Sequence, residues 1–171
     1  SMLKDKSFAV FTFNYRKGFR PNELREDSFA AMKTASELEG VDSKQVLSAG
    51  ASIGADGAAH GCAWLNAQKG KGLCLGAMPL SPGNYLGAPY PAAVAPLQSE
   101  QPPKPVWCFA AEGDRESAPT CNSAQGAVYR QLIYAGNKHG MTLIDPNVKP
   151  KNVDANTLQL MLDWIKVSLG L

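Results

Sequence analysis

Five short apolar runs alternate with stretches of helical periodicity, and this alternation restricts the fold of the chain more than any other feature. The runs are rich in branched, aromatic or small side chains and cover residues 8–13, 45–48, 72–78, 106–111 and 132–135. Helical patterns cover residues 24–39, 49–67, 120–130 and 154–169. Strands that alternate with helices are typical of α/β proteins. We therefore expect a three-layer α/β/α fold around a mostly parallel sheet of about five strands.

The length fits one domain, because 171 residues of which 44% are hydrophobic can bury a single core. We expect residues 1–171 to form that domain, with Ser1 and Met2 left over from cloning. Residues 79–105 hold eight of the twelve prolines, which predicts a long irregular loop. Loops of this length in compact domains usually bind ligands or act as lids.

The charge balance argues against several kinds of partner. The 17 Lys and Arg residues nearly cancel the 15 Asp and Glu residues, giving a formal charge of +2 without a basic cluster, so we expect no nucleic-acid partner. No apolar run approaches the roughly 18 residues of a membrane-spanning helix, so we expect no membrane partner. The charged N-terminus does not resemble a signal peptide and favours a cytoplasmic protein, with secretion as the alternative.

The four cysteines show neither a CxxC pair nor a Cys/His spacing suited to zinc, and we expect no metal site. Three of them lie among apolar or small residues, where buried thiols are common. We expect all four to be reduced.

One motif carries recognisable chemistry: Gly50-Ala51-Ser52-Ile53-Gly54 matches G-x-S-x-G between an expected strand and an expected helix. A sharp strand-to-helix turn at this point exposes the serine hydroxyl. It also directs the backbone N–H of Ile53 toward an oxyanion formed there. The alternative interpretation is that small residues simply pack a tight turn.

A serine nucleophile needs a base, and the chain has two histidines. His139 follows the last expected strand and can meet Ser52, because loops at the carboxyl ends of parallel strands converge on one edge. His60 lies eight residues beyond Ser52 in the same expected helix, about 12 Å away, and we interpret it as a polar residue of the helix surface.

The third member of a triad should come from another strand end. Asp114 follows the fourth expected strand, and the turn at Gly113 can present its carboxylate. Glu112 and Glu116 are neighbours that could replace it. Asp56 lies in a helix and Asp145 lies beyond the histidine, so neither is preferred.

These segments resemble the α/β-hydrolases of the esterase, lipase and dienelactone-hydrolase kind. The motif around Ser52 resembles their nucleophile elbow, Gly113-Asp114 their acid loop and Lys138-His139-Gly140 their histidine loop. Residues 13–19 resemble the family's segment after its fourth strand, commonly D-x-R-G-x-G, with Asn14 in place of the acid. The resemblance implies that Ser52 attacks an acyl carbon, His139 acts as general base and then acid, and Asp114 holds the imidazole.

Typical members of the family have three more N-terminal strands, and the loop after the third supplies a second oxyanion donor. This chain has no counterpart of them, and residues 16–22 could offer a replacement donor. The open sheet edge that results could be covered by a second copy in a homodimer.

We therefore expect a serine hydrolase that cleaves a small ester or thioester without a cofactor. The alternative is a truncated hydrolase fold of little activity that serves as a binding or interaction module. The expected wall of an acyl pocket is Met78, Tyr85, Leu86 and Tyr90, although core packing explains these residues equally well.

Overall fold

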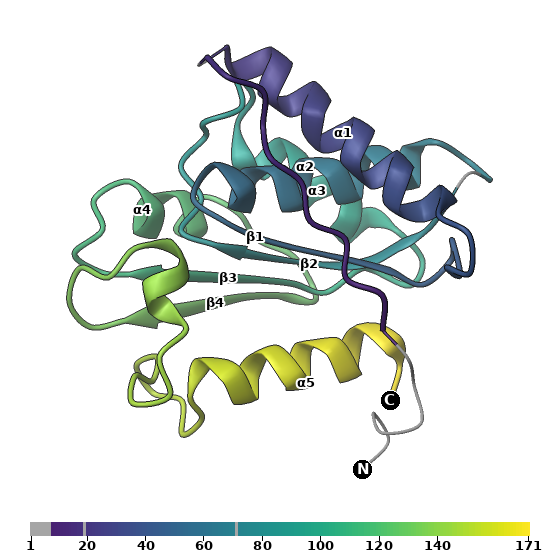
Figure 1. The fold of residues 1–171 in the computed structure, drawn as a ribbon. Coiled ribbons are helices and arrows are strands. Elements are labelled where there is room, and N and C mark those ends of the chain that lie inside the picture. Colours follow the sequence, from purple (N-terminus) through teal and green to yellow (C-terminus); the bar gives the residue numbers. More distant parts are fainter. Residues whose placement is uncertain (1–7, 19, 71) are drawn as a thin grey trace.

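A four-stranded parallel sheet forms the centre of the computed structural model, which describes residues 8–18, 20–70 and 72–171 (Figure 1). Its spatial order β1-β2-β3-β4 follows the chain. The strands are β1 (Val46–Ala51), β2 (Cys74–Leu80), β3 (Val106–Ala111) and β4 (Tyr129–Tyr134). Because every strand pair is parallel, all four carboxyl ends lie at one edge of the sheet.

Helices cover both faces of the sheet, so the structure has three layers (Figure 1). Crossovers that advance in one direction with one handedness place their helices on the same face. That face carries α1 (Pro21–Glu37), α2 (Ile53–Ala67), α3 (Tyr90–Ser99) and α4 (Ser117–Asn122), and the other carries α5 (Thr157–Leu169). A short 3₁₀ helix, η1 (Gly140–Leu143), follows β4.

The central strand β3 shows why both faces must be covered, since all six of its residues are buried. Val106, Cys108 and Ala110 belong to the core beneath α1–α4, whereas Trp107, Phe109 and Ala111 belong to the core against α5. A continuous apolar run is the expected sequence of a parallel strand buried on two sides. The predicted α/β class and parallel sheet are therefore confirmed.

The sheet has four strands where about five were predicted, because residues 8–13 pair with no strand in the described chain. This segment is extended, yet Phe8, Val10, Phe11 and Phe13 are all at least 40% exposed. Together with α1 and β1, the segment lines a cavity of about 200 Å³ beside the open edge of β1.

Residues 79–105 are not irregular throughout, because α3 lies within them. Proline is tolerated in the first turn of a helix, where Pro91 lies, although Pro96 removes one internal hydrogen bond. Tyr90, Val94 and Leu97 are buried on one side of the helix. Burial of this face outweighs the cost of Pro96. The proline count alone was therefore misleading.

The predicted helix over 120–130 is also displaced, since α4 ends at Asn122 and β4 begins at Tyr129. Gly126 packs against the side chain of Gln98, and a Cβ at this glycine would lie 2.2 Å from Gln98 Cγ. Residues 123–128 therefore form a close turn against α3 instead of two further helical turns.

The prediction that all four cysteines are reduced is wrong. Cys62 bonds to Cys74 and Cys108 bonds to Cys121, each pair joining a helix to a neighbouring strand. All four residues are completely buried, although the sequence indicated buried surroundings for only three of them. Cysteines separated by 12 and 13 residues meet only after the βα units have packed, which spacing alone does not reveal.

Candidate active site

Ser52 lies at a strained turn between β1 and α2. Its φ and ψ of 56° and −122° are rarely adopted by a residue with a side chain, and such strain costs on the order of 1–3 kcal/mol. Gly50 permits the turn, because a Cβ at this position would lie 2.1 Å from the carbonyl oxygen of Gly54. The backbone N–H of Ser52 donates to Leu80 O at 2.9 Å, which ties the turn to β2. This is the local geometry that the G-x-S-x-G motif predicts.

Ile53 is the first residue of α2, where a backbone N–H has no acceptor within the helix. The positive end of the helix dipole adds to its attraction for an anion. Among residues 16–22, the N–H of Arg16 is already used, since it donates to Asp27 Oδ2 at 2.9 Å. Ile53 is therefore the donor that the structure places next to Ser52, and Arg16 is not free to be a second one.

Asp114 and His139 meet from the loops after β3 and β4, with Asp114 Oδ2 2.6 Å from His139 Nδ1. The other carboxylate oxygen of Asp114 accepts backbone N–H groups from Ser117 at 3.1 Å and Glu116 at 3.3 Å. Burial alone would raise the pKa of Asp114, but the hydrogen bonds from His139 and Ser117 outweigh it and hold the pKa below its usual value. An ionised carboxylate only accepts hydrogen bonds. The proton of a neutral His139 is therefore on Nδ1, which leaves Nε2 as a base.

The histidine loop adjoins the strained turn. A Cβ on Gly140 would lie 3.5 Å from Ala51 Cβ and 4.0 Å from the backbone nitrogen of Ser52. Gly140 N–H donates to Ser81 Oγ at 2.9 Å, and Ser81 N–H donates to Phe109 O at 2.7 Å. Ser81, which follows β2, thereby joins β3 to the histidine loop. Among the described residues, no hydrogen bond links Ser52 to His139. Asp114 and His139 are therefore in contact with each other, and Ser52 lies near this pair without a hydrogen bond to it.

The alternative acids have other partners. Glu112 pairs with Lys151, Glu116 accepts the hydroxyl of Tyr85 at 2.9 Å, and Asp145 pairs with Lys138 at 2.7 Å. Of the acids considered in the sequence, Asp114 is the one that contacts His139.

The residues expected to line an acyl pocket separate into two groups. Met78, Leu86 and Tyr90 are 1%, 0% and 0% exposed, so they pack in the core and present no surface to a ligand. Tyr85 is half-buried, and its hydroxyl reaches Glu116 in the acid loop. Its ring packs against Gly83, where a Cβ would lie 2.3 Å from the ring. Tyr85 alone of the four borders the site.

Sequence reasoning passed over Asp56, which lies one turn beyond Ser52 in α2 and is completely buried. Its Oδ2 accepts backbone N–H groups from Tyr85 at 2.7 Å and Gly83 at 3.3 Å, and its Oδ1 has no hydrogen-bond partner among the described residues. Burial raises its pKa to about 6 despite these hydrogen bonds. Asp56 thus fixes the loop that carries Tyr85. The sequence did contain one sign of its burial, because Asp56 is a single acid within a run of Gly and Ala residues.

His60 is not a residue of the helix surface, as the sequence suggested, because it is 7% exposed. Burial and the nearby Arg25 lower its pKa to about 4, so it is neutral at physiological pH. Its distance along α2 still separates it from the strand ends.

We found no match to this chain among protein-family models, curated proteins or solved structures. Within residues 8–18, 20–70 and 72–171, no three His, Cys, Asp or Glu side chains converge in a way that could hold a metal ion. No helix in that part of the chain combines the length and apolarity needed to cross a membrane. The function is therefore inferred from the geometry around Ser52.

Proposed function

We propose that the protein is a serine hydrolase of the α/β-hydrolase kind that cleaves a small ester or thioester. The observation that carries this proposal is the 2.6 Å contact between Asp114 and His139 at the edge of the sheet where Ser52 lies in a strained turn. The Ser, Asp, His order along the chain is that of the α/β-hydrolases.

In the proposed reaction, Ser52 Oγ attacks the acyl carbon while His139 Nε2 takes its proton. Ile53 N–H stabilises the oxyanion, and Asp114 stabilises the imidazolium. The C–O or C–S bond then breaks, and His139 gives the proton to the departing alcohol or thiol. Water attacks the acyl-enzyme while His139 takes one of its protons. The bond between the acyl carbon and Ser52 Oγ then breaks, His139 returns the proton to Ser52 Oγ, and the carboxylic acid leaves. The sequence of steps needs no cofactor.

A fluorophosphonate probe tests this proposal, because it phosphonylates serines activated by a histidine. We expect one label on the peptide that contains Ser52, and no label in Ser52→Ala. Ser99→Ala is the matched control, since Ser99 is an exposed serine at the end of α3 and should not affect labelling. Folded wild-type protein that takes no label would overturn the proposal.

The second candidate, a binding or interaction module with little activity, is favoured by the open edge of β1 and the cavity beside it. The predicted homodimer would use this edge, and sedimentation at several concentrations measures it. Turnover of a p-nitrophenyl ester that disappears in His139→Ala would rule out the inactive module.

The compartment is also a matter for experiment. Two disulfides are typical of proteins from oxidising environments, whereas the N-terminal sequence favoured the cytoplasm. Thiol titration of protein isolated from its native source under alkylating conditions would decide between them.

A further inference from the structure

The Asp114 carboxylate is oriented by the chain segment that follows it. Its Oδ2 faces His139, and its Oδ1 is fixed by the backbone N–H groups of Glu116 and Ser117. These two donors lie at the beginning of α4, so a movement of α4 would also move the Asp114 carboxylate that accepts their hydrogen bonds.

The helix α4 cannot hold this position by itself. It has six residues, and helices this short are not stable without tertiary contacts. Its position therefore depends on what fixes its far end.

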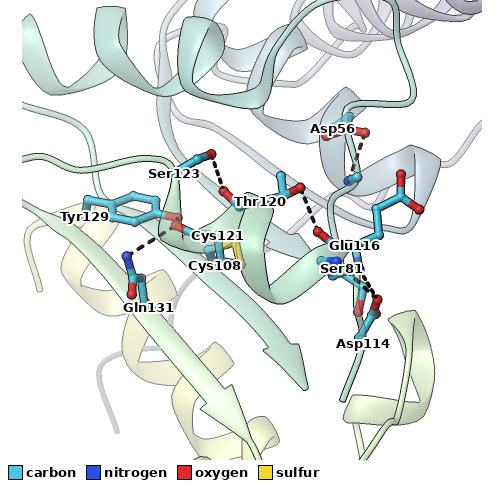
Figure 2. Close-up of a disulfide and its surroundings, with 12 residues drawn as sticks. Asp56, Ser81, Cys108, Asp114, Glu116, Thr120, Cys121, Ser123, Tyr129 and Gln131 are labelled. Atoms are coloured by element: carbon cyan, nitrogen blue, oxygen red, sulfur yellow. Dashed lines mark hydrogen bonds between the residues drawn. A yellow bond between two sulfur atoms is a disulfide. The ribbon is translucent and has the colours of Figure 1, made fainter. Parts of the chain in front are cut away.

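Cys121 fixes that end (Figure 2). Its sulfur is bonded to Cys108 in β3, and its carbonyl oxygen accepts the hydroxyl of Tyr129 at 2.7 Å and the amide of Gln131 at 3.3 Å. The helix also contacts the loop after β2, since Asn84 Nδ2 donates to Thr120 Oγ1 at 3.3 Å. The disulfide is the one covalent tie among these contacts, and it encloses the segment that carries Asp114.

We propose that the Cys108–Cys121 disulfide positions the catalytic carboxylate, because it fixes α4 to β3 and thereby holds Asp114 beside His139. This inference rests on the proposed function for its catalytic meaning. Cys108 and Cys121 are positioning residues, since neither contacts the reacting atoms.

The second disulfide provides a matched control. Cys62 and Cys74 are separated by 12 residues instead of 13, and all four cysteines are completely buried. Cys62 lies ten residues beyond Ser52, about 15 Å along α2, and Cys74 begins β2 at the opposite end of the strand from the site. Its removal should destabilise the protein without moving Asp114.

The test compares Cys108→Ala/Cys121→Ala with Cys62→Ala/Cys74→Ala at a temperature where both are folded. In the first variant we expect amide hydrogen exchange at Glu116 and Ser117 to accelerate by about tenfold or more. We expect kcat on a p-nitrophenyl ester to fall by about 10- to 100-fold with KM changed by less than about twofold. The second variant should keep the wild-type values of exchange and kcat.

The pKa of Asp114, measured by carbon NMR, distinguishes a local effect from a general loss of stability, because a general loss would leave this pKa unchanged. His139, Glu116 and the Tyr85 hydroxyl face this carboxylate from three different loops. Without the fixed N–H donors, the pKa of Asp114 should rise toward its usual value. The other variant should titrate like wild type.

Equal effects of the two variants, or no effect of the first, would overturn the proposal. If Cys108→Ala/Cys121→Ala does not fold, Cys108→Val/Cys121→Ala fills the volume on the strand side. Failure of both to fold would show a general requirement of the fold and would also overturn a local role. Local acceleration of exchange in a protein that the fluorophosphonate does not label would support the positioning role and reject the hydrolase proposal.

Discussion

The two glycines of the Gly50–Gly54 motif should respond in opposite ways to alanine. In Gly50→Ala the new Cβ would lie 2.1 Å from Gly54 O and 2.4 Å from Gly54 C, both backbone atoms of the next turn. Contacts to a Cβ are seldom shorter than 3.0 Å, so β1 and the beginning of α2 must separate by about 1 Å. In Gly54→Ala, the new Cβ would lie within 4 Å of no described atom beyond its chain neighbours and the backbone of its own helix.

The magnitudes follow from these distances. Overpacking a core typically costs about 1–3 kcal/mol, and here the obstacle is backbone that cannot change rotamer. We expect Gly50→Ala to lower the free energy of unfolding by about 3 kcal/mol or more. Alanine is favoured over glycine in a helix by about 0.8–1 kcal/mol, so Gly54→Ala, in the first turn of α2, should be neutral or stabilising.

Urea unfolding followed by circular dichroism measures both free energies, with the slope of the transition compared to detect changes in the unfolded state. Fluorophosphonate labelling of Gly50→Ala below its transition reports whether Ser52 keeps its geometry. A loss below about 1 kcal/mol for Gly50→Ala, or equal losses for the two variants, would refute the reasoning.

Three further predictions concern the base, a disulfide and a buried acid. His139→Ala should lower kcat for a p-nitrophenyl ester by about 10³-fold or more, because the reaction loses its base. Its Tm should stay near that of the wild type, because the His139 side chain is exposed. An unchanged kcat would argue against the role of His139 as base. Cys62→Ala/Cys74→Ala should cost about 3 kcal/mol, which a loop of this length gives, and calorimetry should show a Tm lower by roughly 6–12 °C. The pKa of Asp56 is about 6 in the folded state and 3.8 in the unfolded state, so the folded state binds more protons between these values. The free energy of unfolding should therefore fall as the pH rises from about 4 to 6, by at most about 3 kcal/mol. Asp56→Asn should remove this dependence in urea unfolding at pH 4 and pH 7, and an unchanged pH profile would show that Asp56 does not carry it.

The positions of the site residues could be predicted because each depends on local pattern and strand polarity. Ser52, Asp114 and His139 each follow an apolar run, and parallel strands bring such positions to one edge. The contact between Asp114 and His139 follows from this rule. Neither the partners of Glu112 and Glu116 nor the buried link through Ser81 is visible in the sequence, because they depend on how three loops pack.

The remaining differences arise where tertiary contacts override local preference. Residues 8–13 have the composition of a strand, but strand formation also needs a neighbouring strand, and none pairs with them among the described residues. The helix around Pro96 and the burial of His60 show the same effect, since packing decided both. The disulfides belong to this class as well, because their partners meet only in the folded chain.

The two edges of the sheet are unequal. At β4, Tyr134 forms an isolated bridge with Pro150, and Lys151 N–H donates to Ile133 O at 2.7 Å, so the returning chain covers the carboxyl end of this edge. β1 is the other outermost strand, and Ser52 projects from its end while Asp114 and His139 follow β3 and β4. Among the described residues, β1 therefore offers the longer unpaired edge, and a strand added there would lie next to Ser52. Such an addition would extend the wall next to the nucleophile and leave the acid–base pair as it is.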